Sequence, residues 1–303
     1  MYDIVIIGAG PAGLCAALYA RRAGKSVLLL DRAAFGGQIT YSPRVENYPG
    51  FESISGNELA DRMVEQVLAQ GADVELECVC EIRDDGDTKS VMTEDGNRYD
   101  CRAVIIAAGV RHRHLGLENE EKFIGEGISF CAVCDGAFYA GRDVILVGGG
   151  NSALQEAILL SETCRRVYVV QNLDYLTGEA RLSEILEKRD NVEIITGSTV
   201  KKILGDDTFV GATLERTSTG GTRDISADGM FVAIGLEPEN DIFASLCTLD
   251  ERGYIDSDES CTTRTAGIFA AGDCRRKSVR QVSTAIADGA SAAIAACRYI
   301  DSL

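Results

Sequence analysis

Short apolar runs alternate along the chain with alanine-rich stretches and glycine turns. Residues 4–7 are predicted to form a buried strand. The glycine turn after them is predicted to open a helix that ends near Arg22, and residues 27–30 to form a second strand that ends at Asp31. Strands and helices that alternate in this way are typical of βαβ units on parallel sheets. The pattern therefore predicts an α/β protein.

The same pattern returns near the middle of the chain. Residues 144–147 are predicted to form a strand, 148–150 a glycine turn, 152–163 a helix and 167–170 the next strand. The spacing from Gly150 to Gln171 equals that from Gly10 to Asp31. Another strand-like segment, 267–273, and an alanine-rich helix, 283–300, follow near the end. The second unit is therefore predicted to be inserted into the first domain, with crossings near 110–117 and 235–242.

The first glycine turn has the residues of a dinucleotide site. Gly8 allows the tight turn, Gly10 the close approach of the backbone to a pyrophosphate, and Gly13 the packing of helix on strand. The helix N-terminus favours the anion, and Asp31 stands where a carboxylate can accept a hydrogen bond from a ribose hydroxyl. Because strand, turn, helix and acid all occur together, we predict a bound dinucleotide.

The second glycine turn keeps this geometry in Gly148, Gly150 and Ala153. The segment after the next strand, however, lacks the residues that normally recognise a nicotinamide cofactor. An acid after the next strand normally binds the ribose of NAD, and arginines bind the 2′-phosphate of NADP. Here residues 171–173 are Gln-Asn-Leu. Arg181 follows further on, so a site that binds NAD(P)H through other residues stays open.

Two cysteines, Cys131 and Cys134, stand three positions apart and are followed by Asp135. This spacing suits a redox disulfide or part of a zinc site. Structural zinc takes four nitrogen or sulfur ligands, and the other histidines and cysteines do not stand at zinc-finger spacing. In a flavoprotein the reduced flavin would open the disulfide, Asp135 would supply or take a proton, and the dithiol would exchange with a partner disulfide. We therefore predict a redox pair and no metal site.

Composition narrows the function further. The chain has 303 residues, 46% of them hydrophobic and 25% charged, which suits two globular domains. A formal net charge of −17 argues against nucleic acid and anionic membranes as partners. No apolar run approaches the roughly 18 residues that cross a bilayer, and no signal segment precedes the first strand, so we expect a cytoplasmic protein. Reduced, buried thiols are expected at Cys15, Cys101, Cys164 and Cys297.

Together with these motifs, Gly36-Gly37-Gln38, the segment 45–50 (Val-Glu-Asn-Tyr-Pro-Gly) and Ala271-Gly272-Asp273 closely resemble low-molecular-weight thioredoxin reductases along essentially the whole chain. The resemblance implies two Rossmann-like dinucleotide-binding domains. An FAD-binding domain, residues 1–112 and 242–303, would be split by an inserted nucleotide-binding-type domain, 113–241, that carries the cysteine pair. It also implies a homodimer, with thioredoxin or a similar small dithiol protein as its partner.

The resemblance implies roles for individual residues as well. Cys134 would be the sulfur nearest the flavin, Cys131 the one that attacks the partner disulfide, and Asp135 the acid. FAD would be held by the first glycine turn and by residues from later segments: Gly8, Gly10, Ala12, Gly13, Asp31, Gly37, Gln38, Asn47, Asp273, Arg280 and Gln281.

The chain departs from the family at the electron donor. NADPH-dependent members carry a His-Arg-Arg stretch with a further Arg shortly after it, where residues 171–177 here are Gln-Asn-Leu-Asp-Tyr-Leu-Thr. This loss is similar to ferredoxin-dependent flavin thioredoxin reductases, which take single electrons from an iron–sulfur protein. Transfer from a plant-type ferredoxin at about −400 mV to thioredoxin at about −270 mV is downhill by roughly 6 kcal/mol for two electrons. Reduced ferredoxin is therefore the predicted donor.

An acidic ferredoxin would need a local basic patch on this acidic chain. Candidates are residues 111–114, Arg-His-Arg-His, and 275–277, Arg-Arg-Lys. Two alternatives stay open. One is an NAD(P)H-dependent thioredoxin reductase with a divergent cofactor site. The other is a flavin-bearing redox sensor whose Cys131–Cys134 pair switches conformation without turnover.

Overall fold

The structure is a computed structural model that describes residues 1–42 and 44–303. The chain divides into two compact units. The first contains residues 1–42, 48–111 and 237–303, and the second contains 44–47 and 112–236. At the two crossings between them, the short strands β7 (Arg111–His112) and β16 (Leu236–Glu237) pair with each other.

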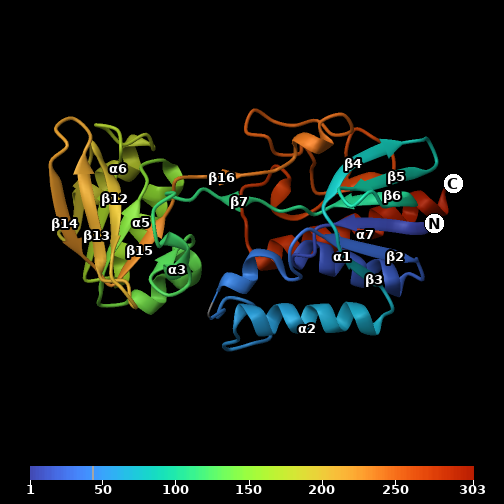
Figure 1. Ribbon diagram of the computed structural model, residues 1–303, viewed down its shortest axis with the longest axis horizontal. Helices are drawn as coiled ribbons and strands as arrows, with labels where there is room; N and C mark the ends of the chain where they lie inside the picture. Colours follow the sequence, from blue (N-terminus) through green and yellow to red (C-terminus); the bar gives the residue numbers. More distant parts are fainter. Residues whose placement is uncertain (43) are drawn as a thin grey trace. The chain divides into compact units, whose positions relative to one another are not determined.

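A seven-stranded sheet forms the frame of the first unit (Figure 1). Its order is β3 (Asp73–Leu76), β2 (Val27–Asp31), β1 (Tyr2–Ile7), β6 (Arg98–Ile106), β5 (Lys89–Thr93) and β4 (Val79–Asp84), and β17 (Ile268–Ala270) also pairs with β6. Strands β1, β2, β3, β6 and β17 pair in parallel, whereas β4 and β5 add an antiparallel extension. The predicted strands 4–7, 27–30 and 267–273 all lie in the parallel part, whereas β3, β6 and the antiparallel extension were not predicted.

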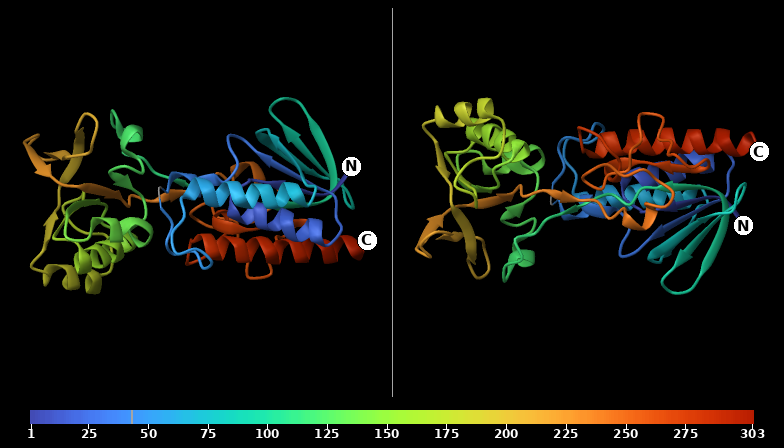
Figure 2. Two further views of the ribbon diagram at one scale, coloured as in Figure 1. Left: turned by 90° about the horizontal axis from the view of Figure 1, so that it is seen from below. Right: turned by 90° about the horizontal axis from the view of Figure 1, so that it is seen from above.

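Three helices run alongside one another in this unit: α1 (Pro11–Arg22), α2 (Gly56–Ala69) and α7 (Val282–Asp301) (Figure 2). Short 3-10 helices lie at η1 (Gly37–Tyr41), η3 (Asp241–Phe243) and η4 (Gly272–Cys274). Helices α1 and α7 pack closely because small residues face each other. A Cβ on Gly289 would lie only 2.1 Å from the carbonyl oxygen of Ala12. This contact brings the start of α7 to the first glycine turn.

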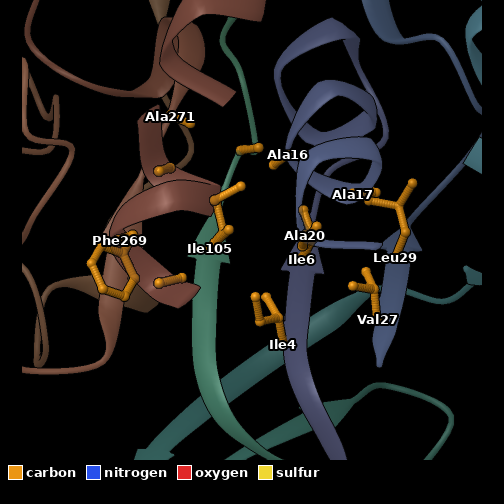
Figure 3. Packing of buried hydrophobic residues seen from close by; sticks show 14 of the residues in the cluster. Ile4, Ile6, Ala16, Ala17, Ala20, Val27, Leu29, Ile105, Phe269 and Ala271 are labelled. Atoms are coloured by element: carbon orange, nitrogen blue, oxygen red, sulfur yellow. The ribbon is translucent and has the colours of Figure 1, made fainter. Parts of the chain in front are cut away.

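The inner parallel strands β1, β2, β6 and β17 are apolar on both faces, as buried parallel strands are. On one face Ile6 and Leu29 pack with Ala17 and Ala20 of α1, and Figure 3 shows these side chains between strands and helix. On the other face the neighbouring residues of the same strands enter a second cluster. Period-two alternation between two cores explains the continuous apolar runs of the sequence.

The second unit is built on a five-stranded parallel sheet in the order β11 (Val192–Ile195), β10 (Arg166–Val170), β9 (Asp143–Val147), β15 (Gly229–Val232) and β8 (Ile128–Ser129). A separate antiparallel sheet contains β12 (Ser198–Leu204), β13 (Gly211–Arg216) and β14 (Thr222–Ser226). The helices are α3 (Glu120–Phe123), α4 (Ala132–Asp135), η2 (Gly136–Tyr139), α5 (Asn151–Thr163) and α6 (Ala180–Glu187).

The prediction of an α/β fold with two dinucleotide-binding-type units on parallel sheets is confirmed. The four thiols expected to be buried, Cys15, Cys101, Cys164 and Cys297, are buried and free. No helix within residues 1–42 and 44–303 is both long and apolar enough to cross a membrane.

Candidate redox and flavin sites

Cys131 and Cys134 form a disulfide, with their Cα atoms 5.3 Å apart. Cys131 is the N-cap of α4, and the backbone N–H of Cys134 donates to the Sγ of Cys131 at 3.2 Å. Val133 between them is 59% exposed, so this turn reaches the surface of its unit. No group of three or more His, Cys, Asp or Glu residues that could hold a metal ion occurs within residues 1–42 and 44–303.

Asp135 follows the disulfide on α4 and is held by one hydrogen bond. The Oγ of Ser129 donates to its Oδ2 at 2.6 Å, whereas its buried Oδ1 has no hydrogen-bond partner in the described part of the chain. Burial raises the pKa of Asp135, and the bond from Ser129 only partly opposes this. A carboxyl group that keeps its proton to higher pH than usual suits a general acid beside a disulfide.

A second carboxyl group lies against the same turn. The Oε2 of Glu156, on α5, accepts a hydrogen bond from the backbone N–H of Ala132 at 3.3 Å. Burial raises the pKa of Glu156 to about 7, and the bond from Ala132 partly opposes the rise. Sequence reasoning missed this residue because Glu156 is one polar position of a helix, and only the packing of α5 on α4 brings it to the cysteines.

The first glycine turn has the geometry predicted from its spacing. Gly8 has a φ of 102°, and a Cβ there would lie 2.3 Å from the carbonyl oxygen of Ala107. A Cβ on Gly13 would lie 1.8 Å from the carbonyl oxygen of Gly8, so the start of α1 could not pack on β1 with any side chain there. Both glycines are therefore required by the backbone.

Two other segments meet the start of α1. The turn at 36–37 lies on it, because a Cβ on Gly37 would be 3.0 Å from the Cα of Gly10. The turn at 271–273 lies on it as well, since a Cβ on Gly272 would be 2.8 Å from the Cβ of Ala12. These contacts bring together three of the predicted FAD residues, Gly10, Ala12 and Gly37, and place Asp273, which follows Gly272, beside them.

Asp273 carries the observation that fits a bound flavin nucleotide. Its Oδ1 is buried and has no hydrogen-bond partner in residues 1–42 and 44–303. Burial raises the pKa of Asp273. Buried polar atoms in folded proteins nearly always have a partner, so an unpaired carboxyl oxygen beside a dinucleotide turn is suited to a hydroxyl donor of a bound ligand. The residues present therefore fit FAD.

The remaining predicted residues have structural contacts of their own. Asp31 accepts hydrogen bonds from Ala9 N at 2.7 Å and from Ala33 N at 3.1 Å, which shapes the glycine turn. The side-chain amide of Gln38 donates to the carbonyl oxygen of Val110.

The other three predicted FAD residues lie further along the chain. The Arg280 guanidinium lies 4.2 Å from the centre of the Tyr254 ring, and its Nε is 3.4 Å from the Asp273 carbonyl oxygen. Gln281 is the N-cap of α7. Asn47 is grouped with the second unit, so the structure does not bring it together with the others within one unit.

The second glycine turn is covered by the chain's own residues. A Cβ on Gly149 would lie 2.5 Å from the side-chain amide of Gln171, so this side chain rests on the turn. The backbone N–H groups of Thr177 and Gly178 both donate to the carbonyl oxygen of Gly149, at 2.8 and 2.9 Å. The segment 171–178 therefore folds onto the turn that a pyrophosphate would have to approach.

The N-terminus of α5 also carries an acid. Asn151, its first residue, donates from Nδ2 to the Oε1 of Glu179 at 3.2 Å and accepts at Oδ1 from Glu179 N at 2.7 Å. A carboxylate at this helix end opposes the binding of another anion. The exposed guanidinium of Arg181 has no ion pair or hydrogen bond within the described residues, so it remains available to a ligand.

The expectation of a basic docking patch at 275–277 is wrong. The side chains of Arg275 and Lys277 are only 3% and 8% exposed, because both pair with Asp288, at 2.7 and 2.8 Å. Arg276 is exposed and pairs with Asp256 at 3.0 Å. Three successive basic residues resemble a surface patch in the sequence, but here they mainly balance a buried acid.

The candidate patch at 111–114 has little free charge. The exposed Arg111 pairs with Glu239 at 3.1 Å. His112 stacks on Phe130, with ring centres 4.8 Å apart. Burial, together with the nearby His114, lowers the pKa of His112 to about 4, so this side chain is neutral at pH 7.

Comparisons with known proteins show which proteins this chain is similar to. The chain matches the pyridine nucleotide-disulphide oxidoreductase family over residues 2–289. A thioredoxin reductase from Listeria monocytogenes is 43% identical over 100% of this chain and 95% of its own length. A 34.2 kDa protein in the rubredoxin operon of Clostridium pasteurianum is 42% identical over 98% of this chain and 97% of its own. The crystal structure of thioredoxin reductase from Streptococcus pyogenes has a TM-score of 0.95 at 40% identity, and the match covers 100% of this chain and 99% of that one.

Proposed function

The chain belongs to the pyridine nucleotide-disulphide oxidoreductase family as a flavoprotein disulfide oxidoreductase with FAD as its cofactor, and we propose that it reduces thioredoxin with electrons from ferredoxin. The observation that carries the disulfide chemistry is the Cys131–Cys134 bond with the half-buried acid Asp135 beside it. Thioredoxin is proposed as the substrate because relatives that match the full chain are thioredoxin reductases.

The first unit is proposed to hold FAD and the second to carry the dithiol. Gly8, Gly10 and Gly13 leave the backbone free to approach a pyrophosphate, and the start of α1 favours its charge. The unpaired Oδ1 of Asp273 would accept a hydrogen bond from a ligand hydroxyl. When bound, FAD supplies a carrier that accepts electrons one or two at a time, which lets a one-electron donor serve a two-electron reaction.

The dithiol is proposed to work as an exchange pair. Cys131 would attack the disulfide of thioredoxin as a thiolate, which the N–H of Cys134 stabilises through the bond it already makes to this sulfur. Asp135 would hold the proton that a departing thiolate requires, because its raised pKa keeps it protonated to higher pH than an exposed aspartate. Cys134 would then close the disulfide with Cys131 and release reduced thioredoxin.

The closed second glycine turn supports ferredoxin as the donor, whereas the candidate basic patches at 111–114 and 275–277 do not add support. Residues 171–179 contain Asp174 and Glu179 but no lysine or arginine, so they offer no charged partner for a 2′-phosphate. Gln171 rests on Gly149, and Glu179 lies at the helix N-terminus. A nicotinamide dinucleotide would have to displace the Gln171 side chain and bind against the negative charge of Glu179.

One observation favours NADPH instead. Arg181 is exposed and unpaired in the described part of the chain, one turn beyond the segment that covers the glycine turn. If that segment moves, Arg181 could bind the phosphate. The redox-sensor alternative is set aside, because the chain is an oxidoreductase of a catalytic family.

Steady-state turnover tests the proposal. Purified holoenzyme and thioredoxin would be supplied with NADPH, with NADH or with continuously reduced ferredoxin, and the thioredoxin thiols formed would be counted. Turnover only with ferredoxin supports the proposal, and turnover with NADPH that is lost in Arg181→Gln supports the alternative. We further propose a homodimer, which sedimentation of the holoenzyme would test.

A further inference from the structure

Glu156 is a half-buried titratable group to which the reaction above assigns no role. Its Oε2 accepts from the N–H of Ala132, the residue that follows Cys131 directly, so the carboxyl group lies within a few bonds of the sulfur proposed to attack thioredoxin. It comes from a different helix, α5, and its position depends on the packing of α5 against α4. The contact therefore links a long helix to the redox turn.

The surroundings of Glu156 contain few charges that could decide its state. Burial raises its pKa to about 7, and only the bond from Ala132 opposes the rise. Titratable or charged groups on the elements packed against α5 are Asp135, Tyr139, Asp143, Arg166, Tyr168, Arg181, Glu184 and Glu187, besides the disulfide itself. None of them contributes to the shift at Glu156 in the disulfide state. A new charge at Cys131 would therefore be the main electrostatic change that this carboxyl group meets.

We propose that Glu156 is a positioning residue for the dithiol, which holds the amide between the two cysteines and takes up a proton when the disulfide is reduced. This inference rests on the proposed function only in that Cys131 and Cys134 are the redox pair. It adds a regulation of that pair, because the charge of Glu156 would set how readily Cys131 ionises.

The reason is repulsion between two anions that both accept hydrogen bonds from amides of the same turn, Glu156 from Ala132 and Cys131 from Cys134. On reduction the S–S bond breaks and the two sulfurs receive two electrons from the reduced cofactor. One of the sulfurs then takes up a proton, so the pair becomes one thiol and one thiolate. The thiolate on Cys131 and the carboxylate of Glu156 then repel each other, since like charges disfavour the ionised form of both groups. A second proton, from solvent, would neutralise Glu156.

The pH range in which Glu156 affects the Cys131 thiol follows from the sign of their interaction. Well below pH 7 Glu156 is already neutral and cannot affect the thiol. Above about pH 7 its carboxylate raises the pKa of the Cys131 thiol and slows thiolate formation. Replacing Glu156 by glutamine keeps an oxygen that can accept from Ala132 but removes the charge.

Alkylation of the reduced holoenzyme tests the proposal. The protein would be reduced with a phosphine, freed of it, and treated with iodoacetamide from about pH 5 to about pH 9. Modification of Cys131 would be followed by mass spectrometry, because the exposed Cys80 also reacts. Glu156→Gln is compared with Glu162→Gln, whose parent residue lies on the same helix, is exposed and pairs with Arg189 at 3.6 Å. Neither ferredoxin nor thioredoxin is needed, so this result is independent of the electron donor.

We expect Cys131 of Glu156→Gln to react up to about tenfold faster than wild type near pH 8, which corresponds to one pKa unit, and equally fast near pH 6. Glu162→Gln should follow wild type throughout. Superimposed profiles for wild type and Glu156→Gln would overturn the proposal.

A second measurement needs no change at Glu156. In an Asp135→Asn background, the infrared difference between reduced and oxidised protein near pH 8 should show a stronger protonated carboxyl band, because the reduced pair shares one proton between the Glu156 carboxylate and the Cys131 thiolate. Absence of that increase would also overturn the proposal.

Discussion

Replacing Asp288 by asparagine is predicted to destabilise the first unit and to lower its affinity for FAD. The Asp288 side chain, on α7, is 7% exposed and accepts hydrogen bonds from Arg275 at 2.7 and 2.9 Å and from Lys277 at 2.8 Å. Its Oδ2 also accepts from the backbone N–H of Gly272 at 3.0 Å, directly before Asp273. One carboxylate thus pairs with two buried cations and fixes the turn that carries a proposed FAD residue.

The size of the effect follows from burial. Removing one partner of a buried ion pair costs roughly 3–5 kcal/mol, because the opposite charge stays buried without compensation. Asparagine keeps the shape and one acceptor oxygen, so we expect the lower end, about 3 kcal/mol, in the free energy of unfolding.

Urea unfolding of the holoenzyme, followed by circular dichroism and by flavin release, would measure the loss. The matched control is Asp256→Asn, which removes the partner of the neighbouring Arg276. That pair is 43% and 64% exposed and should contribute no more than about 1 kcal/mol. An Asp288→Asn protein within 1 kcal/mol of wild type, by the same measure, would refute the reasoning.

The pH dependence of this effect has a defined sign. Burial favours the protonated acid, but hydrogen bonds from Arg275 and Lys277 outweigh it, so the pKa of Asp288 lies below its usual value. A lowered pKa gives stability that is present above the unfolded value of about 3.9 and is lost as the pH falls through the folded value. The difference between wild type and Asp288→Asn should therefore be constant near neutrality and shrink below about pH 4.

Three further predictions concern the chemistry. Cys134→Ser should bind FAD and accept electrons, as seen in its visible spectrum, but should not reduce thioredoxin. Retained turnover would show that the cysteine pair does not carry electrons from the flavin to thioredoxin. Asp273→Ala should weaken FAD binding by about 10- to 100-fold, since a hydrogen bond to a charged group contributes roughly 1.5–3 kcal/mol, and an unchanged dissociation constant by flavin fluorescence would contradict the site. Asp135→Asn should slow thioredoxin reduction by about 10²- to 10⁴-fold. It should also remove the loss of rate that wild type shows above the raised pKa of Asp135, and an unchanged pH–rate profile would exclude Asp135 as the acid.

The elements that the sequence predicted are those that local patterns define. Both strand–turn–helix–strand units were found because apolar runs and glycine turns repeat at equal spacing, and α7 because alanines run through it. Strands β4, β12 and β14 were missed because half-exposed antiparallel strands carry weaker apolar runs than buried parallel ones. Their partners β5 and β13 were missed as well.

The errors at the site have one physical cause, which is that burial depends on distant segments. Arg275 and Lys277 look like surface charges until Asp288, on another element, pairs with them. Glu156 has no motif of its own and reaches the cysteines only through helix packing. The departure at Gln171 was visible in the sequence, but its contact with Gly149 was not, because that contact needs the fold of the loop.

The electron donor is the central claim, and anaerobic flavin absorbance tests it most directly. NADPH, NADH and chemically reduced ferredoxin would be added separately to the purified protein, and oxidised thioredoxin afterwards. We predict that ferredoxin alone bleaches the flavin and that thioredoxin restores the colour. Rapid bleaching by a nicotinamide would contradict it and would show that Arg181 or another group reads the cofactor once residues 171–178 move from the second glycine turn.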